Sequence, residues 1–216
     1  MNIYNVIILD ESGSMSSIYK ETLASMNEVL SGIRKNQEEF PDQKHFVTIV
    51  TFEGDGMKGV KTRRDRVSID TVSPFTEEDY NPGGCTPLYD AIGKTLHEME
   101  AQTTEEDTVL VTIITDGMEN SSREYNANII KNLNKRLQDK GWAITYIGAN
   151  QDAKQVAHEM NVDIAMCWDS TPEGTAQMSL RSKKIHHEMA KCAYFKMSWD
   201  KVKEFVDKME KEMDGE

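Results

Sequence analysis

Two acidic residues and three hydroxyl residues fall where predicted strands end and helices begin. The five residues are Asp10, Ser12, Ser14, Thr86 and Asp116. Their side chains all offer hard oxygen ligands, which suit Mg²⁺, Mn²⁺ or Ca²⁺ better than a soft metal. The sequence therefore predicts a divalent metal site, with Mg²⁺ as the preferred ion.

The elements that would position these residues are five short apolar runs. The runs are rich in Val and Ile and show little polar alternation, which is typical of strands covered on both faces. They span residues 3–9, 46–52, 109–114, 142–147 and 164–168. Segments with helical spacing lie between them, at 23–33, 88–99 and 129–137, and Gly141 is placed to end the last of these. This alternation predicts a doubly wound α/β fold with a mainly parallel six-stranded sheet.

Two regions depart from the alternation. Residues 54–73 contain only short apolar pieces and predict a small antiparallel edge strand or hairpin. The segment 175–195 predicts a long helix, and a final helix from residue 198 carries one apolar stripe: Val202, Phe205, Val206, Met209 and Met213. We expect a core domain over residues 1–170 and C-terminal helices over 171–216 that pack on it or extend it.

The predicted sheet brings the metal residues to one edge. The first strand delivers Asp10 to its carboxyl end, and the run from 109 delivers Asp116 in the same way. In doubly wound sheets, ligands bind outside the carboxyl ends of the strands. A loop at 83–87 is able to present the Thr86 hydroxyl at the same edge.

Each piece has an ordinary structural explanation by itself. A serine-containing loop before a helix is more often an N-cap, and Thr86-Pro87 is typical of a helix start with Thr as the cap. Asp116-Gly117 alone is usually a turn. The three pieces in this order, at strand ends of an α/β pattern, favour the metal site.

The same residues resemble the von Willebrand factor A-type domain over about residues 3–168. The family's metal-ion-dependent adhesion site combines an Asp-x-Ser-x-Ser loop, a distant Thr and a later Asp that Gly often follows. Here these are Asp10-Glu11-Ser12-Gly13-Ser14, Thr86 and Asp116-Gly117, so all five positions match.

The resemblance implies how the site works. Ser12 and Ser14 would ligate the metal directly, while Asp10, Thr86 and Asp116 would ligate it directly or through water. An open coordination place would accept an Asp or Glu carboxylate from a partner protein, and this binding would couple to a shift of the last helix. Bacterial cytoplasmic members of the family often work beside ATP-driven remodelling machines.

Composition narrows the classes of partner. The formal net charge of −12 opposes binding to nucleic acid and to anionic membranes, and a solvated turn explains the basic cluster at 61–66 at least as well as a binding patch does. No run of about twenty apolar residues and no secretion-type start is found, which predicts a cytoplasmic protein.

The cysteines Cys85, Cys167 and Cys192 fit neither a disulfide framework nor a zinc site, so we expect reduced, partly buried thiols.

Other polar residues are weaker candidates. Several acidic side chains are placed to rim the site, although a solvated acidic face explains them equally: Glu11, Glu77, Glu78, Asp79 and Glu119. The adjacent His186 and His187 point in different directions on a helix, so we expect surface residues rather than a shared metal site. Cys85 is interpreted as a small packing residue.

Three functions fit the predicted site. The favoured one is a non-enzymatic module that binds a partner carboxylate through Mg²⁺. The second is a metal-dependent hydrolase or phosphoryl-transfer enzyme. The sequence offers little for it, because the chain lacks a GxxxxGK loop, an Asp-x-Asp at the first strand and a GxSxG elbow. Nothing singles out a catalytic base such as Glu119. The third is a structural subunit that docks its helix face 175–213 onto a larger assembly.

Overall fold

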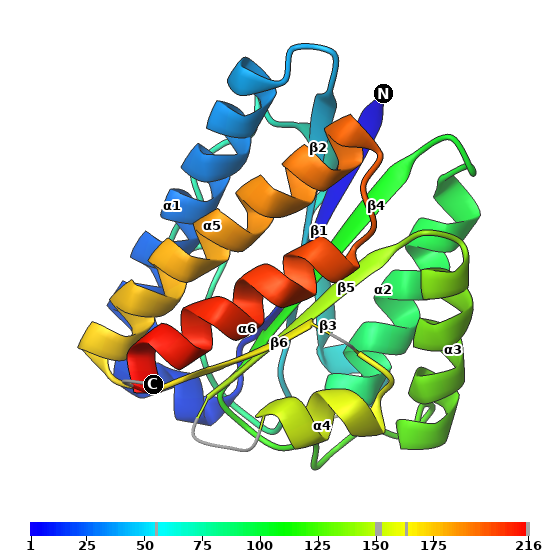
Figure 1. Ribbon diagram of the computed structural model, residues 1–216. Coiled ribbons are helices and arrows are strands. Elements are labelled where there is room, and N and C mark those ends of the chain that lie inside the picture. The colour runs from blue at the N-terminus through cyan, green and yellow to red at the C-terminus, as the bar shows by residue number, and fades with distance from the viewer. Residues whose placement is uncertain (55, 150–152, 163, 215–216) are drawn as a thin grey trace.

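The sheet in the computed structural model has six strands in the order β3-β2-β1-β4-β5-β6 (Figure 1). The structure describes residues 1–54, 56–149, 153–162 and 164–214. The strands are β1 (Asn2–Asp10), β2 (Lys44–Phe52), β3 (Val60–Ser68), β4 (Thr108–Thr115), β5 (Ala143–Ala149) and β6 (Ile164–Trp168). All neighbours are parallel except β2 and β3, so the predicted mainly parallel sheet with one antiparallel edge strand is confirmed.

Helices cover both faces of the sheet. α1 (Tyr19–Glu39), α5 (Pro172–Phe195) and α6 (Asp200–Asp214) lie on one face, and α2 (Leu88–Gln102), α3 (Ala127–Asp139) and α4 (Ala153–Glu159) lie on the other (Figure 1). Short 3₁₀ helices η1 (Gly13–Ile18) and η2 (Gly56–Gly59) complete the elements. None of the described helices is long and apolar enough to cross a bilayer.

The strands are apolar throughout because both faces of the sheet are buried. In β1, Ile3 and Ile7 pack toward α1 and α5, whereas Val6 and Ile8 pack toward α2 and α3. All four side chains are fully buried. The predicted end of the third helix is also correct, since Gly141 adopts φ +91°, a left-handed conformation that favours glycine.

Two features differ from the sequence prediction. The predicted edge element is a single nine-residue strand, β3, and it contains the basic cluster that we assigned to a solvated turn. The strand pairs with β2, and two of its arginines have acidic partners: Arg63 binds Glu11 and Arg64 binds Asp79. The seven-residue helix α4 was not predicted.

The C-terminal helices share the core of the sheet domain. The core cluster on the α1 side of the sheet includes buried side chains from both helices. They are Met178, Ile185 and Met189 of α5 and Val202 and Val206 of α6. Phe205 and Met209 pack against this cluster and are partly buried, while the side chain of Met213 lies outside the described residues. Most of the predicted apolar stripe of α6 therefore packs on the domain.

A buried polar seam lies between the sheet and α5. His186 is only 2% exposed, which corrects our assignment of it to the surface, and its Nε2 lies 3.3 Å from Thr112 Oγ1. His45 Nε2 lies 2.8 Å from Gln43 Oε1. Burial lowers the pKa of both histidines to about 4.

The buried histidines predict acid sensitivity. His186 titrates near pH 6.5 in the unfolded chain but near 4 when folded, so its contribution is present above pH 6.5 and is lost as the pH falls toward 4. Relative to His186→Leu, the free energy of unfolding of the wild type should fall by up to about 1.4 kcal/mol more per pH unit in this window. Urea titrations at several pH values measure the difference. Parallel curves for the two proteins, or an equal effect of His158→Leu at an exposed position, would contradict it.

Candidate metal centre

Three loops meet beyond the carboxyl ends of β1 and β4. These strands are neighbours in the sheet, so Asp10 at the end of β1 and Asp116 just after β4 arrive side by side. The third loop carries Thr86 ahead of α2. Backbone hydrogen bonds join it to the first loop, from Gly83 N to Glu11 O (2.8 Å) and from Gly13 N to Gly84 O (3.2 Å).

The predicted ligands contact one another directly. Ser12 Oγ and Ser14 Oγ lie 3.2 Å apart, and Ser14 Oγ donates to Asp116 Oδ1 at 2.6 Å. The backbone N–H of Ser12 donates to Asp10 Oδ1 at 2.7 Å. Four of the five predicted residues therefore form one connected group.

Gly117 shows that Thr86 faces the same space. A Cβ atom added to Gly117 would lie 3.3 Å from Thr86 Oγ1, 3.7 Å from Ser14 Oγ and 3.8 Å from Asp10 Oδ2. Oxygens from the loop after β1 and from the Thr86 loop thus lie around a space that a side chain at Gly117, in the loop after β4, would enter. Two carboxylates and three hydroxyls around such a space form a donor set that fits Mg²⁺ or Mn²⁺.

The hydroxyls are not used for helix capping. Ser12 is the N-cap of η1, but its side chain forms no capping hydrogen bond. α2 begins at Leu88 with Pro87 as its N-cap, so Thr86 lies outside the helix. The ordinary explanations of these residues as caps are therefore wrong, and their oxygens are available to a ligand.

Asp10 is a fully buried carboxylate. Its Oδ2 accepts from Thr115 Oγ1 at 2.5 Å, and its backbone carbonyl accepts from the buried Tyr80 hydroxyl at 2.9 Å. Burial raises the pKa of Asp10 to about 6, against the opposing effect of the hydrogen bonds from Thr115 and Ser12. Sequence reasoning missed Thr115 and Tyr80, although Thr115 is adjacent to Asp116.

We had suggested that Glu11 lies at the edge of the candidate metal site, but its carboxylate points toward Arg63 and supports the serine loop from the side of β3. Its fully buried carboxylate accepts two hydrogen bonds from Arg63 of β3, at 3.0 and 2.9 Å, and one from the backbone N–H of Asn81. Arg63 Nε also donates to Thr51 Oγ1 at 2.9 Å. This pair fastens the serine loop, the edge strand and the Thr86 loop together.

Glu119 and Asn120 brace the third loop. Glu119 accepts from the backbone N–H groups of Tyr89, Ser121 and Ser122, so it too points away from the site. Asn120 Oδ1 accepts from Thr86 N at 2.8 Å, and Asn120 N donates to Thr86 O at 3.1 Å. The loop after β4 thereby sets the position of Thr86.

The remaining acidic candidates lie elsewhere. Asp79 binds Arg64 at 2.7 Å, and Glu77 and Glu78 are exposed. Among the described residues, no three His, Cys, Asp or Glu side chains form a group able to hold a metal. A metal at this edge would therefore depend on the hydroxyl ligands.

The cysteines differ from our expectation of partly buried thiols. Cys85 and Cys167 are exposed, and only Cys192 is buried. Cys85 is exposed in the loop beside Thr86, so it is not the packing residue that we had expected.

Comparisons with known proteins assign the fold to a family. The family model described as the von Willebrand factor type A domain matches residues 6–173, well over half of the chain. The chain belongs to this family. Domains of this family, here called VWA domains, commonly act as protein-interaction modules. A search of curated proteins finds no match.

Solved structures show the same fold at low sequence identity. The SpRpn10 VWA domain is 10% identical with a TM-score of 0.61, and the match covers 82% of this chain and 94% of that one. Proximal thread matrix protein 1 from the mussel byssus is 16% identical with a TM-score of 0.57, covering 86% and 46%. The pilus adhesin SpaC from Lactobacillus rhamnosus GG is 13% identical with a TM-score of 0.64, covering 84% and 30%. This chain thus spans less than half of the latter two proteins.

A methyl group at Gly117 should weaken metal binding without unfolding the domain. Gly117→Ala places Cβ beside three candidate ligand oxygens, where it would crowd the hydration shell of a bound Mg²⁺ ion. Gly83→Ala is the matched control, because a Cβ there meets no atom within 4 Å. Calorimetric titration with Mg²⁺ should show about tenfold weaker binding for Gly117→Ala alone. Equal affinities for the two variants would contradict this placement of the ligand space.

The Glu11–Arg63 pair should be important for stability. Arg63→Met leaves the buried Glu11 charge without its partner and should lower the free energy of unfolding by about 3–5 kcal/mol. Arg63→Lys retains a positive charge and should lose less. Urea unfolding measures both values, with Lys61→Met on the same strand, a more exposed cation that pairs with Glu53, as the control. A loss below about 1 kcal/mol for Arg63→Met would show that Glu11 is not held by this pair.

Proposed function

We propose that this VWA domain binds a partner protein through Mg²⁺, with an acidic side chain of the partner completing the coordination. The proposal rests on one observation: five oxygen-bearing side chains from three loops converge on one space, and their hydroxyls are not committed to helix caps. Asp10, Ser12, Ser14, Thr86 and Asp116 would hold the ion. The ion would supply a positive charge that attracts a carboxylate.

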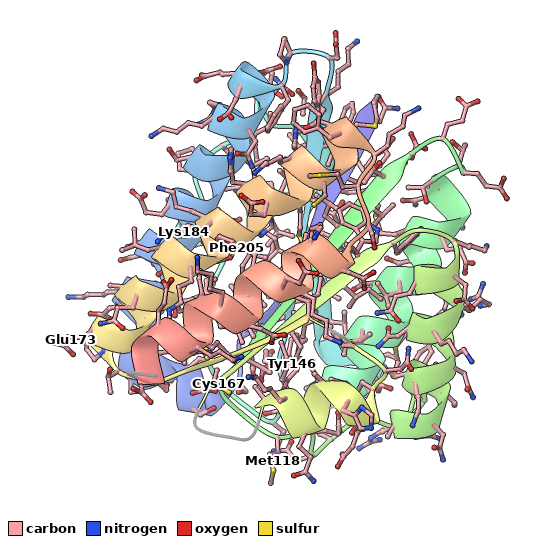
Figure 2. The ribbon with its side chains drawn as sticks, viewed as in Figure 1. Met118, Tyr146, Cys167, Glu173, Lys184 and Phe205 are labelled. Atoms are coloured by element: carbon pink, nitrogen blue, oxygen red, sulfur yellow. The ribbon has the colours of Figure 1, made fainter. Side chains whose placement is uncertain are left out.

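One side of the site is open to a partner. Ser14 is exposed and Asp116 is half-buried, whereas Asp10, Ser12 and Thr86 are buried. Met118, two residues after Asp116, is 72% exposed and projects from the same end of the molecule as α4 (Figure 2). An apolar side chain beside a charged anchor is typical of a protein-binding surface.

The same site is connected to the start of α5. Ser170, two residues before that helix, donates through Oγ to Asp116 Oδ2 at 3.3 Å. A change in how Asp116 ligates the metal would act on this contact. We propose that partner binding shifts α5 by this route.

We favour a binding role over a catalytic one. Glu119, the candidate base, directs its carboxylate to backbone N–H groups and the Ser122 hydroxyl, so it is not free to take a proton from a substrate. Phosphatase and esterase screens that find turnover lost in Asp10→Ala would overturn this preference.

Metal binding should depend on the two serines. Calorimetry should detect binding of Mg²⁺ and of Mn²⁺ to the wild-type chain and little or none to Ser12→Ala/Ser14→Ala, because direct hydroxyl ligands are lost. Ser16→Ala is a matched control on the adjacent exposed turn. No binding to the wild type at millimolar metal would contradict the proposal.

Asp10 should be needed for the metal but not for the metal-free fold. Its buried carboxylate has no ion-pair partner among the described residues, and its raised pKa means that the ionised form lowers the stability of the folded state relative to the unfolded state at neutral pH. Asp10→Asn should therefore melt, in chelator, at or above the wild-type Tm and lose the rise in Tm that Mg²⁺ produces. A large fall of the Tm in chelator would show that the charge itself supports the fold.

Capture from lysate tests the partner. Wild-type chain in Mg²⁺ should retain a protein that chelator or the double serine variant releases. A protein retained under all conditions would instead indicate a docking surface independent of the metal.

A further inference from the structure

A groove of about 720 Å³ runs over the outer surface of α5. Its floor comes from α5, and its walls come from α1 on one side and α6 on the other (Figure 1). None of the five candidate metal ligands lines it. The groove is therefore separate from the site at the carboxyl edge of the sheet.

Apolar side chains with unburied surface line part of this groove. Leu180 is 59% exposed, although it lies on a helix whose other side is in the core. Phe205 and Met209 of α6 are only partly buried and face the same groove. A cluster of this kind on a helical surface is typical of a protein-binding groove.

The groove also carries lysines that form no ion pair among the described residues, although the charge of Lys35 acts on Glu28 of the same helix. Lys35 of α1 and Lys184 of α5 are exposed and form no ion pair within the described ranges. The acidic residues of the groove are engaged or have a basic neighbour: Glu188 binds Lys191 at 3.4 Å, Glu212 lies 3.9 Å from Lys208, and Glu39 lies 3.8 Å from His187. Figure 2 shows Lys184 and Phe205 close together on this face.

We propose that this groove binds an amphipathic, acidic helix of a partner protein. A helix about 10–12 Å across suits a groove bounded by two helices, and apolar residues at helical spacing would cover Leu180, Phe205 and Met209. Carboxylates flanking that apolar face would pair with Lys35 and Lys184.

Selection from a display library of single helices, with all surface positions randomised, tests this proposal. Wild-type chain is the bait in chelator, so the candidate metal site cannot contribute, and Leu180→Glu is used for counter-selection. The enriched helices should carry Leu, Phe or Met at three- and four-residue spacing with Asp or Glu on the flanks. The affinity of an enriched helix should fall about tenfold for Lys35→Glu/Lys184→Glu and rise on lowering the salt concentration.

The control is Lys20→Glu/Lys131→Glu, which changes the net charge equally at exposed positions outside the groove. Circular dichroism and Tm establish that all variants are folded. The proposal is overturned if no helix is enriched over the counter-selection, if the enriched helices are basic, or if both double variants weaken binding equally. Dimerisation through this face, detected by sedimentation and abolished by Leu180→Glu, would assign the groove to a second copy instead.

Discussion

Asp10 places a carboxylate at the end of a central strand, where it is fully buried and has no positive partner among the described side chains. Burying an unpaired carboxylate is costly, and the raised pKa of Asp10 reflects that cost. Hydrogen bonds from Thr115 and Ser12 hold the group in place without neutralising it. A divalent cation is the kind of ligand that would compensate such a charge, which makes Asp10 the residue on which the proposed function depends.

The surrounding loops are fixed by acidic residues that play no part in the ligand set. Glu11 binds Arg63 behind the serine loop, and Glu119 with Asn120 ties the loop after β4 to Thr86 and the start of α2. The three loops are therefore fastened to one another before any ligand arrives. Preorganisation of this kind lowers the entropic cost of assembling a binding site.

The sequence was sufficient to predict the sheet and the meeting of the five candidate ligands at its carboxyl edge. Long Val- and Ile-rich runs mark buried parallel strands, and the position of a residue at a strand end locates it at the carboxyl edge. The direction of the acidic side chains was not predictable. The side chain of Glu11 could point toward the candidate metal site or toward Arg63. The outcome depends on the register of β3 against β2, and bulges in this pair of strands shift that register.

Other errors have the same origin in tertiary contacts. His186 and His187 are adjacent, but only the rotation of α5 against the sheet decides that His186 is buried. The basic run 61–66 looks like a solvated turn until its partners Glu11 and Asp79 are known. α4 is too short for a periodic pattern to reveal it.

The two proposed binding surfaces lie on different parts of the molecule and have different chemistry. The metal site is an oxygen-lined edge that would attract a single carboxylate, whereas the groove over α5 offers apolar contact area with flanking lysines. Because α5 begins two residues after Ser170, which contacts Asp116, one helix connects them. A partner that occupies both surfaces would bind more tightly than either contact alone allows.

Anomalous diffraction from a crystal of the full chain soaked in Mn²⁺ tests the central claim most directly. The account predicts one strong manganese peak at the carboxyl edge of the sheet, within about 2–2.3 Å of Ser12 Oγ and Ser14 Oγ, with Asp10, Thr86 and Asp116 around it. A fully occupied manganese site elsewhere in the chain, with no peak between these two serines, would contradict it.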